Sequence, residues 1–270
     1  MLTYKKIGFI GGGNMAEALI KGLHAGGFPA SDITVAEPVE DRRRFLNDRY
    51  GITVTSDNTV VATSCDVIIL AIKPQMVAPV LAQVAPALVS GTRLISIMAG
   101  VKSSAIEAAV PTGVRVVRVM PNTPALVLEG ATAICAGKSA SDEDVNLARR
   151  IFDLVGKTWQ VDEKLMDAVT GLSGSGPAYV LTIIEALSDA GVKNGIPRDV
   201  AAGLAAQTVF GTAKLLLETR EHPAVLRDKV TSPGGTTIAG LHVMERKGVR
   251  GTLMNAVDAA TARSKELGGS

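Results

Sequence analysis

The sequence predicts an α/β protein in which a doubly wound parallel sheet comes first and an all-helical domain follows. Apolar runs alternate with helical patterns through residues 1–161, as happens where helices cover both faces of a parallel sheet. After residue 161 the period changes, and nearly every segment has the spacing of an amphipathic helix. The predicted domains are therefore residues 1–161 and residues 162–270.

Strands in the first domain are predicted where short apolar runs end in turn residues. They are Ile7–Ile10, Ile33–Ala36, Val67–Ile72, Leu94–Ile97, Val114–Val119, Ala131–Ala136 and Thr158–Val161. The helices predicted between them are Asn14–Ala25, Glu40–Tyr50, Met76–Val89, Ser103–Val110 and Ser141–Leu154. Those predicted in the second domain are Glu163–Gly171, Ala178–Val192, Pro197–Leu217, Ala224–Val230, Thr237–Lys247 and Arg250–Leu267. Their alanine-rich and broadly apolar faces suit close helix packing and burial against another subunit.

Composition excludes several classes of function. The 28 basic and 26 acidic residues are scattered along the chain and give a net charge of +2, without the basic stripe typical of nucleic-acid binding. Cys65 and Cys135 are too few for a disulfide framework and lack metal-ligand spacing, so we expect two buried thiols and no metal. The chain has no signal-peptide pattern and no run of eighteen apolar residues, which predicts a cytoplasmic protein without a membrane partner.

The first strand runs directly into a glycine turn and a helix start, with the sequence I-G-F-I-G-G-G-N-M-A from Ile7 to Ala16. Gly11, Gly13 and Ala16 match the pattern G-x-G-x-x-G/A, in which glycines allow a tight turn and the close approach of a pyrophosphate. The phosphates would meet the N–H groups at the start of the helix near Asn14. Many glycine turns bind nothing, but the order of strand, turn and helix favours a dinucleotide site here.

Two further loops follow predicted strands at the carboxyl edge of the sheet, where open α/β sheets place their ligands. Ala71–Pro74 reads A-I-K-P, and its position is a better argument than Lys73 itself, since loop lysines are usually solvated. Met120–Pro124 reads M-P-N-T-P, and its two prolines fix the backbone around Asn122 and Thr123. A rigid turn without a ligand is the alternative for this second loop.

Two segments rich in glycine and serine each precede a long predicted helix. They are S-G-S-G-P-A-Y at Ser173–Tyr179 and S-P-G-G-T-T at Ser232–Thr237. A helix N-terminus with free N–H groups and neighbouring hydroxyls suits a carboxylate, because the helix dipole and the hydrogen bonds act together. Helix capping by Ser and Thr would use the same residues without a ligand, but two such segments beside a dinucleotide fold favour binding.

Together and in this order, these motifs resemble pyrroline-5-carboxylate reductase over essentially the whole chain. The resemblance implies an N-terminal Rossmann domain, a C-terminal helical dimerisation domain and hydride transfer from a nicotinamide cofactor to a cyclic imine. The product would be L-proline, in the last step of proline biosynthesis. The resemblance also implies a homodimer through the C-terminal helices, and it allows further assembly into a decamer.

The same resemblance assigns site residues. Ser232, Gly235 and Thr236 would hold the carboxylate of the substrate 1-pyrroline-5-carboxylate. The Thr237 hydroxyl would bond the ring nitrogen as the catalytic group, and Glu163 would lie near the ring. An imine carbon accepts a hydride readily only when the imine nitrogen carries a proton, and a hydroxyl can orient or relay that proton. The cofactor-binding residues would be Ile10, Gly11, Gly12, Gly13, Asn14, Met15, Asn58, Ala71, Ile72, Lys73, Pro74, Ala99, Gly100, Asn122 and Thr123.

The choice of cofactor stays open. Glu37 stands where many members of the family have serine or threonine, and an acidic residue there would bind a ribose 2′-hydroxyl and repel a 2′-phosphate. It favours NADH, whereas family membership favours NADPH, as would an arginine of Arg42–Arg44 that folded back onto the phosphate. The expected cofactor is NADPH, with NADH possible. A second departure from the family, Lys229, would contact a phosphate or point to water.

Other classes of function fit less well. A 3-hydroxyacid dehydrogenase would share the domain plan but would be expected to carry a catalytic lysine on the first long C-terminal helix, which has none before Lys193. A non-catalytic nicotinamide sensor would not need S-P-G-G-T-T, and a purely structural oligomer would need neither glycine-rich segment. The three histidines, His24, His222 and His242, lie on predicted helices or their starts and indicate no catalytic triad.

Overall fold

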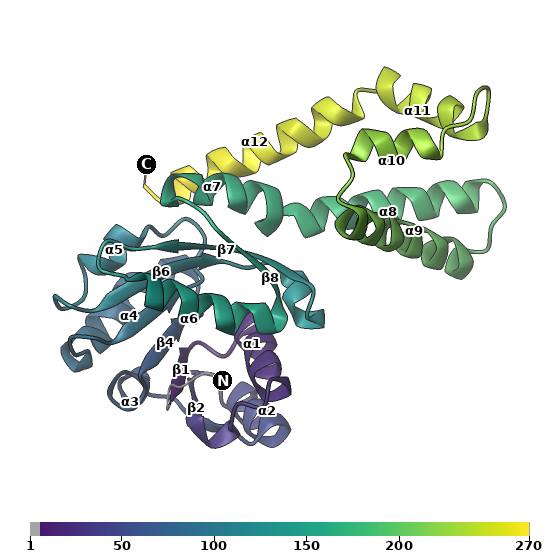
Figure 1. The fold of residues 1–270 in the computed structure, drawn as a ribbon. Coiled ribbons are helices and arrows are strands. Elements are labelled where there is room, and N and C mark those ends of the chain that lie inside the picture. Colours follow the sequence, from purple (N-terminus) through teal and green to yellow (C-terminus); the bar gives the residue numbers. More distant parts are fainter. Residues whose placement is uncertain (1–5, 270) are drawn as a thin grey trace. The chain divides into compact units, whose positions relative to one another are not determined.

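The computed structural model describes residues 6–269 and contains an eight-stranded sheet (Figure 1). Its strands are β1 (Ile7–Ile10), β2 (Ile33–Ala36), β3 (Thr53–Thr55), β4 (Val67–Leu70), β5 (Arg93–Ser96), β6 (Arg115–Met120), β7 (Gly130–Ala136) and β8 (Gly156–Gln160). They lie in the order β3-β2-β1-β4-β5-β6-β7-β8, and all neighbours are parallel except β6 and β7. The chain moves outward from β1 to β3 and then crosses to β4 on the other side of β1. This is the predicted doubly wound arrangement.

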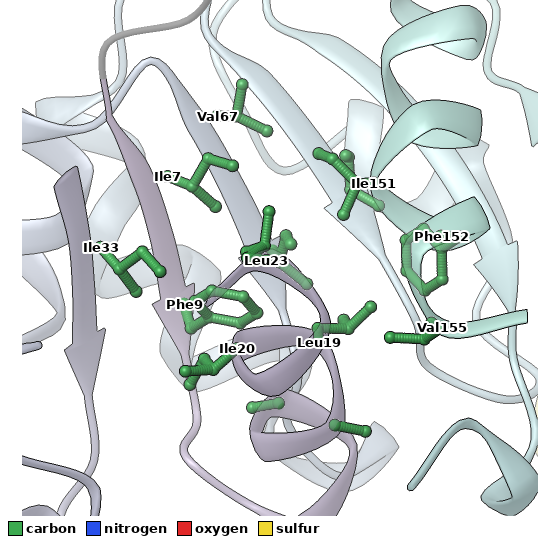
Figure 2. Packing of buried hydrophobic residues seen from close by; sticks show 14 of the residues in the cluster. Ile7, Phe9, Leu19, Ile20, Leu23, Ile33, Val67, Ile151, Phe152 and Val155 are labelled. Atoms are coloured by element: carbon green, nitrogen blue, oxygen red, sulfur yellow. The ribbon is translucent and has the colours of Figure 1, made fainter. Parts of the chain in front are cut away.

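Helices cover both faces of the sheet. Successive side chains of each strand point to opposite faces, so an apolar strand presents apolar side chains to a layer of helices on each face. On one face Phe9 of β1 packs with Leu23 and Phe152, which come from α1 and α6, as Figure 2 shows. On the other face Ile68 and Leu70 of β4 pack against α3, α4 and α5. These helices are α1 (Asn14–Ala25), α2 (Glu40–Tyr50), α3 (Asn58–Ser64), α4 (Val77–Val84), α5 (Ser103–Glu107) and α6 (Asp142–Phe152).

By compactness the described chain forms two units. The first contains the residues up to Ser175 and also those from Asp258 onward, and the second contains Gly176–Val257. The helices after the sheet are α7 (Met166–Val169), α8 (Gly176–Lys193), α9 (Arg198–Thr219), α10 (Pro223–Lys229), α11 (Thr236–Arg246) and α12 (Val249–Leu267). The final helix α12 thus begins in the second unit and ends in the first. The predicted boundary between residues 161 and 162 does not coincide with either boundary of these units, and it remains a prediction.

The second unit has almost no interior of its own. Ser188, Ala201 and Ala205 are its only buried residues, and the structure describes this unit completely. Large apolar side chains on α9 are exposed instead, among them Leu204 and Phe210 at 55% and 56%. By length and composition α9 could cross a membrane, since its mean hydropathy is 1.4 and 11% of the apolar window is buried. A single helix of this kind is weak evidence for a membrane span.

Several elements differ from those predicted. The apolar pattern does not predict β3 or α3, because they have only three and seven residues. The helix predicted at Met76–Val89 is shorter, because Pro86 lies in a 3-10 turn directly after α4 and cannot donate a helical hydrogen bond. The helix predicted at Glu163–Gly171 is divided into a 3-10 turn, the four residues of α7 and a π turn. Antiparallel β7 departs from the predicted parallel sheet.

Candidate functional site

Loops from neighbouring strands meet along the carboxyl edge of the sheet. Because β2, β1, β4, β5 and β6 are parallel neighbours, their carboxyl ends lie at the same edge (Figure 1). The segments that follow them are, in that order, Glu37, the glycine turn, Ala71–Pro74, Ala99–Gly100 and Asn122–Thr123. The winding reverses between β1 and β4, and open α/β sheets bind ligands at such a switch point. The structure therefore places the predicted cofactor-binding loops at one edge.

The glycine turn after β1 has the shape that a dinucleotide requires. Gly11 has φ +96°, a left-handed conformation that favours glycine. A Cβ on Gly11 would lie 2.4 Å from the Ala71 carbonyl oxygen, whereas a Cβ on Gly13 would meet nothing within 4 Å. Helix α1 starts directly after Gly13, and no side chain caps it. The turn leaves backbone N–H groups and open space for a pyrophosphate, so these residues fit the predicted cofactor.

A cleft of about 600 Å³ adjoins this turn, within the range of small-molecule and cofactor sites. The predicted cofactor-binding residues that line it are Ile10, Gly11, Gly13, Glu37, Asn58, Ala71, Ile72 and Lys73. Those that do not line it are Gly12, Asn14, Met15 and Pro74, which are their sequence neighbours, and Ala99, Gly100, Asn122 and Thr123, which follow β5 and β6. Among the predicted loops, those that follow β1, β2 and β4 therefore line the cleft, whereas those that follow β5 and β6 do not.

Asn58 is held in the cleft wall by neighbouring polar groups. Its amide nitrogen donates to Gln83 Oε1 over 2.8 Å. Asp57, the residue before it, caps α3 by accepting from the N–H and the hydroxyl of Thr59. The Thr59 hydroxyl and N–H lower the pKa of Asp57, so this cap is ionised at neutral pH. The position of Asn58 in the cleft wall is thus fixed by Gln83 and by the cap of α3.

The three consecutive arginines do not line the cleft. Arg42 donates to the Gly12 carbonyl oxygen, and Arg43 donates to the carbonyl oxygens of Glu37 and Pro38. Arg44 forms an exposed ion pair with Glu40 one helical turn away. The structure thus places Arg42 and Arg43 against the backbone and leaves Arg44 in solvent.

The loops after β5 and β6 are tied into the first unit. Gly100 has φ +74°, and a Cβ there would lie 3.2 Å from the Ser264 carbonyl oxygen, so this loop packs closely against the end of α12. Asn122 uses both ends of its amide, donating to the Ser173 carbonyl oxygen over 3.1 Å and accepting from the Ala131 N–H over 2.8 Å. Asn122 is 9% exposed, so its side chain primarily fixes the loop.

Glu163 belongs to a hydrogen-bonded cluster in the first unit. Its two carboxylate oxygens accept from the Ser103 N–H and hydroxyl, each over 2.6 Å. Arg118, only 2% exposed, lies 3.4 Å from Glu163 and 3.9 Å from Asp167. Asp167 in turn accepts from the Ser264 hydroxyl over 2.7 Å. The cluster connects α5, β6, α7 and α12, and it holds Glu163 in one orientation.

Ser232–Thr237 forms the entry to α11 in the second unit. Gly234 has φ +68°, and the Gly235 N–H donates to the Ser232 carbonyl oxygen over 3.1 Å. Gly235 is the capping residue of α11, and no side chain caps this helix. The Ser and Thr hydroxyls are therefore not used as helix caps. A helix N-terminus in this state can accept an anion.

The first glycine- and serine-rich segment does not form a free helix N-terminus, contrary to prediction. Residues Thr170–Gly174 form a π turn, and the Ser175 N–H donates to the Thr170 carbonyl oxygen over 2.8 Å. Helix α8 begins immediately afterwards, at Gly176. The Ser173 hydroxyl donates to the Val169 carbonyl oxygen. These polar groups therefore form hydrogen bonds within the helical segment that leads into α8.

The remaining polar residues that the sequence singled out have structural surroundings. Cys65 and Cys135 are buried and free, as predicted. Burial raises the pKa of both thiols, and for Cys135 burial and the nearby Glu163 raise it to about 12. Lys229 forms an ion pair with Glu221 over 2.6 Å in the second unit. Among residues 6–269, no group of His, Cys, Asp and Glu side chains has a metal-binding arrangement.

Comparisons with known proteins agree with this geometry. Residues 163–267 match the family model for pyrroline-5-carboxylate reductase dimerisation, and residues 6–100 match that for NADP oxidoreductase, coenzyme F420-dependent. The chain is 49% identical over 265 residues to a pyrroline-5-carboxylate reductase of Methanosarcina acetivorans, covering 98% of each protein. It is 47% identical over 262 residues to one of Glycine max, covering 97% of this chain and 95% of the relative. The chain belongs to the pyrroline-5-carboxylate reductase family.

Solved structures of this family have the same fold. The pyrroline-5-carboxylate reductase of Coxiella burnetii has a TM-score of 0.92 at 38% identity, covering 98% of this chain and 99% of that one. The Plasmodium falciparum pyrroline carboxylate reductase, solved with NADP bound, has a TM-score of 0.89 at 36% identity and 99% coverage of both chains. The chain is therefore an NAD(P)H-dependent oxidoreductase. Its helical region is a dimerisation domain, and this domain contains α9.

In this member of the pyrroline-5-carboxylate reductase family, sequence reasoning missed residues that hold the site in place. Arg42 contacts the glycine turn, and a signal was present, since Arg42, Leu46 and Tyr50 are spaced four apart on α2. Arg118 is a charged residue in the middle of the apolar strand β6, which indicates a buried ionic partner. For Gln83, which lies in the cleft wall, no such pattern was present.

Proposed function

We propose that the chain reduces 1-pyrroline-5-carboxylate to L-proline with NADH or NADPH, the last step of proline biosynthesis. The observation that carries the substrate assignment is the uncapped N-terminus of α11, which has two threonine hydroxyls beside its first N–H groups. A small carboxylate suits this helix start because the N–H groups and the helix dipole act together. The dinucleotide cleft in the first unit supplies the other half of the reaction.

The cofactor half of the site consists of the residues that line the cleft or adjoin it. The N–H groups of Gly13 and Asn14 would face the pyrophosphate, and Gly11 keeps the turn tight. Glu37 and Asn58 bind the adenosine ribose, and Met15 packs at the start of α1. The remaining loops, which enclose the nicotinamide side, are Ala71–Pro74, Ala99–Gly100 and Asn122–Thr123. The bound nicotinamide supplies the hydride that adds to the C=N carbon.

The substrate half of the site binds the substrate, orients its ring and keeps the ring nitrogen protonated. Ser232, Gly235 and Thr236 hold the carboxylate, and the Thr237 hydroxyl bonds the ring nitrogen and keeps a proton there. With the nitrogen protonated, the C=N carbon is a better hydride acceptor. Hydride addition moves the π electrons onto the nitrogen, which stays in the ring as a neutral secondary amine and can then take up a proton from water. Glu163, whose carboxylate is held by Ser103 in the first unit, would contact the substrate ring. This division of work needs neither a metal nor an amino-acid nucleophile.

Assembly follows from the exposed apolar faces of the second unit. A unit with three buried residues does not hold its helices by its own interior, and a second copy of the same unit supplies the missing contacts. We therefore propose a homodimer through the C-terminal helices, with a decamer as its larger assembly. The composition favours the cytoplasm as its location.

The reaction is tested by mixing the purified protein with 1-pyrroline-5-carboxylate and following the absorbance of NADH and NADPH separately, with an imine-free blank. Oxidation that depends on the imine is the expected result. Cofactor binding without oxidation of the cofactor would contradict the reductase assignment and indicate a non-catalytic nicotinamide-binding sensor.

Thr237→Ala separates the chemical step from cofactor binding. Loss of the hydroxyl is expected to lower kcat about a hundredfold, as for other positioned proton-transfer groups, and to leave the Kd for NADH unchanged. Thr237→Ser keeps the hydroxyl and is the matched control, expected to retain most of the turnover. Unchanged kcat in Thr237→Ala would remove Thr237 from the mechanism.

A further inference from the structure

Gly12, at the centre of the phosphate-binding turn, is held on both sides by side chains. Its N–H donates to Glu37 Oε2 over 2.8 Å, and its carbonyl oxygen accepts from Arg42 Nε over 2.6 Å. Arg42 also approaches the Gly13 carbonyl oxygen, at 3.3 Å. Hydrogen bonds that involve a charged partner are stronger than neutral ones. The orientation of the turn is thus set by an acidic and a basic side chain together.

The Arg42 guanidinium is itself held in place by Glu17 and Phe45. Its Nη2 donates to Glu17 Oε2 over 2.7 Å, and its guanidinium lies 5.0 Å from the centre of the Phe45 ring. The other oxygen of Glu17 accepts from the Tyr50 hydroxyl over 3.0 Å. Burial and Glu17 raise the pKa of Tyr50, so the hydroxyl keeps its proton at neutral pH. Arg42 is therefore committed to the turn and to Glu17.

The Glu37 carboxylate is also held in one orientation, by two backbone N–H groups. Its second oxygen, Oε1, accepts from the Val39 N–H over 3.0 Å, so each carboxylate oxygen has one backbone partner. Each oxygen can accept a further hydrogen bond, and the 2′- and 3′-hydroxyls of a ribose supply two donors. A 2′-phosphate would instead place like charges next to each other.

No arginine among the described residues lines the cleft to offset this carboxylate. The other charged residue in the lining is Lys73. Lys73 follows β4 and Glu37 follows β2, with β1 between them, so their strands are about 10 Å apart at the usual strand spacing. Arg43 lies beside Glu37, but its Nη1 is already engaged, because it donates to the carbonyl oxygens of Glu37 and Pro38 over 2.7 Å each. The described lining on the Glu37 side thus offers no cation to a 2′-phosphate.

We propose that this reductase prefers NADH, that Glu37 is the residue that selects it, and that Arg42 is a positioning residue for the turn that binds both cofactors. The proposal rests on binding of the adenosine half of the cofactor in this cleft and does not require reduction of the imine. Selection and positioning have different consequences. Glu37 acts on the ratio of the two affinities, whereas Arg42 acts on both affinities alike.

The experiment is a measurement of the Kd for NADH and for NADPH, by nicotinamide fluorescence or calorimetry without the imine. The wild type is expected to bind NADH at least about tenfold more tightly, a difference of about 1.4 kcal/mol. Glu37→Ser is expected to lower the NADPH Kd relative to the NADH Kd by about tenfold. Equal or tighter NADPH binding in the wild type, or an unchanged ratio in the variant, would overturn the selection.

Arg42→Met keeps the apolar stem and removes the donors. It is expected to raise both Kd values about tenfold with their ratio unchanged, and Arg42→Lys to restore part of the loss. Arg44→Met, on the same helix but exposed, is the control and is expected to change neither value. A merely structural role would lower the melting temperature and alter the KM for the imine as well. Unchanged Kd values in Arg42→Met, or equal changes in Arg42→Met and Arg44→Met, would overturn the positioning role.

Discussion

The two units of this reductase are built on opposite principles. The first unit buries its apolar side chains in two layers against one sheet, and residues such as Phe9 and Ile68 are completely enclosed by the same chain. The second unit buries only Ser188, Ala201 and Ala205, and leaves the apolar side chains of its helices exposed. The first unit thus encloses its core within one chain, whereas the helical unit, which lies within a dimerisation domain, does not.

This difference also separates what each half contributes to function. The cofactor cleft is shaped by backbone positions and buried ionic contacts within one chain, such as Arg42 on Gly12. The helix start at Gly235, which we propose binds the substrate carboxylate, belongs to the unit that buries only three residues. Cofactor binding should therefore be independent of assembly, and turnover should depend on it.

The largest effect is expected from a charge on the exposed apolar face of α9. Leu204→Glu places a carboxylate where the dimer would bury an apolar side chain, and at interface centres such changes cost about 2–4 kcal/mol. Analytical ultracentrifugation should show dissociation to monomers. Val89→Glu is the matched control, since Val89 is equally apolar and 68% exposed but lies in the first unit. Persistence of the wild-type assembly in Leu204→Glu would show that α9 is outside the interface.

A smaller effect is expected at the glycine turn, where two alanine substitutions separate folding from cofactor binding. Gly11→Ala combines a positive φ with a backbone contact at 2.4 Å and should cost about 3 kcal/mol of unfolding free energy. Gly13→Ala has room and should cost about 1 kcal/mol or less, yet its methyl group occupies the pyrophosphate side and should raise the Kd for NADH. Urea unfolding and cofactor titration check the two results. Equal losses of stability would refute this view of the turn.

The smallest effect is expected from Asp144, a carboxylate buried in the first unit. Burial alone would raise its pKa, but hydrogen bonds from Ser141 and Arg93 and the charge of Arg115 outweigh burial and hold the pKa below its usual range. A lowered folded-state pKa stabilises the fold above the unfolded value of about 3.9 and ceases to do so as pH falls through the folded-state value.

Asp144→Asn should therefore lose about 2 kcal/mol at pH 7 and show a smaller further loss on acidification than the wild type. Urea unfolding at neutral and acidic pH measures both. Asp142→Asn, at an exposed position in the first turn of the same helix, is the control. Because the contacts lie within one chain, the loss should not depend on protein concentration. A concentration-dependent loss would mean that the first unit is also stabilised by assembly.

The sequence predicts those features that depend on local patterns. The strands β1 and β2 and the helices α1 and α2 lie where period and capping place them, and the glycine turn has the predicted conformation. Local pattern indicates that Arg42 and Arg118 face the interior, but it does not identify the partners of Arg42, Arg118 or Glu163, because these are 25 to 60 residues away in sequence. The structural role of Ser173 likewise depends on a π turn that its glycines and serines do not specify.

The most direct test of this account is a comparison of binding and turnover in the Leu204→Glu protein, after circular dichroism has shown that it is folded. The account predicts a Kd for NADH within about twofold of the wild type and a fall of about a hundredfold or more in kcat/KM for 1-pyrroline-5-carboxylate. A monomeric variant that reduces the imine at the wild-type rate would contradict it. So would a folded variant that loses NADH binding together with assembly.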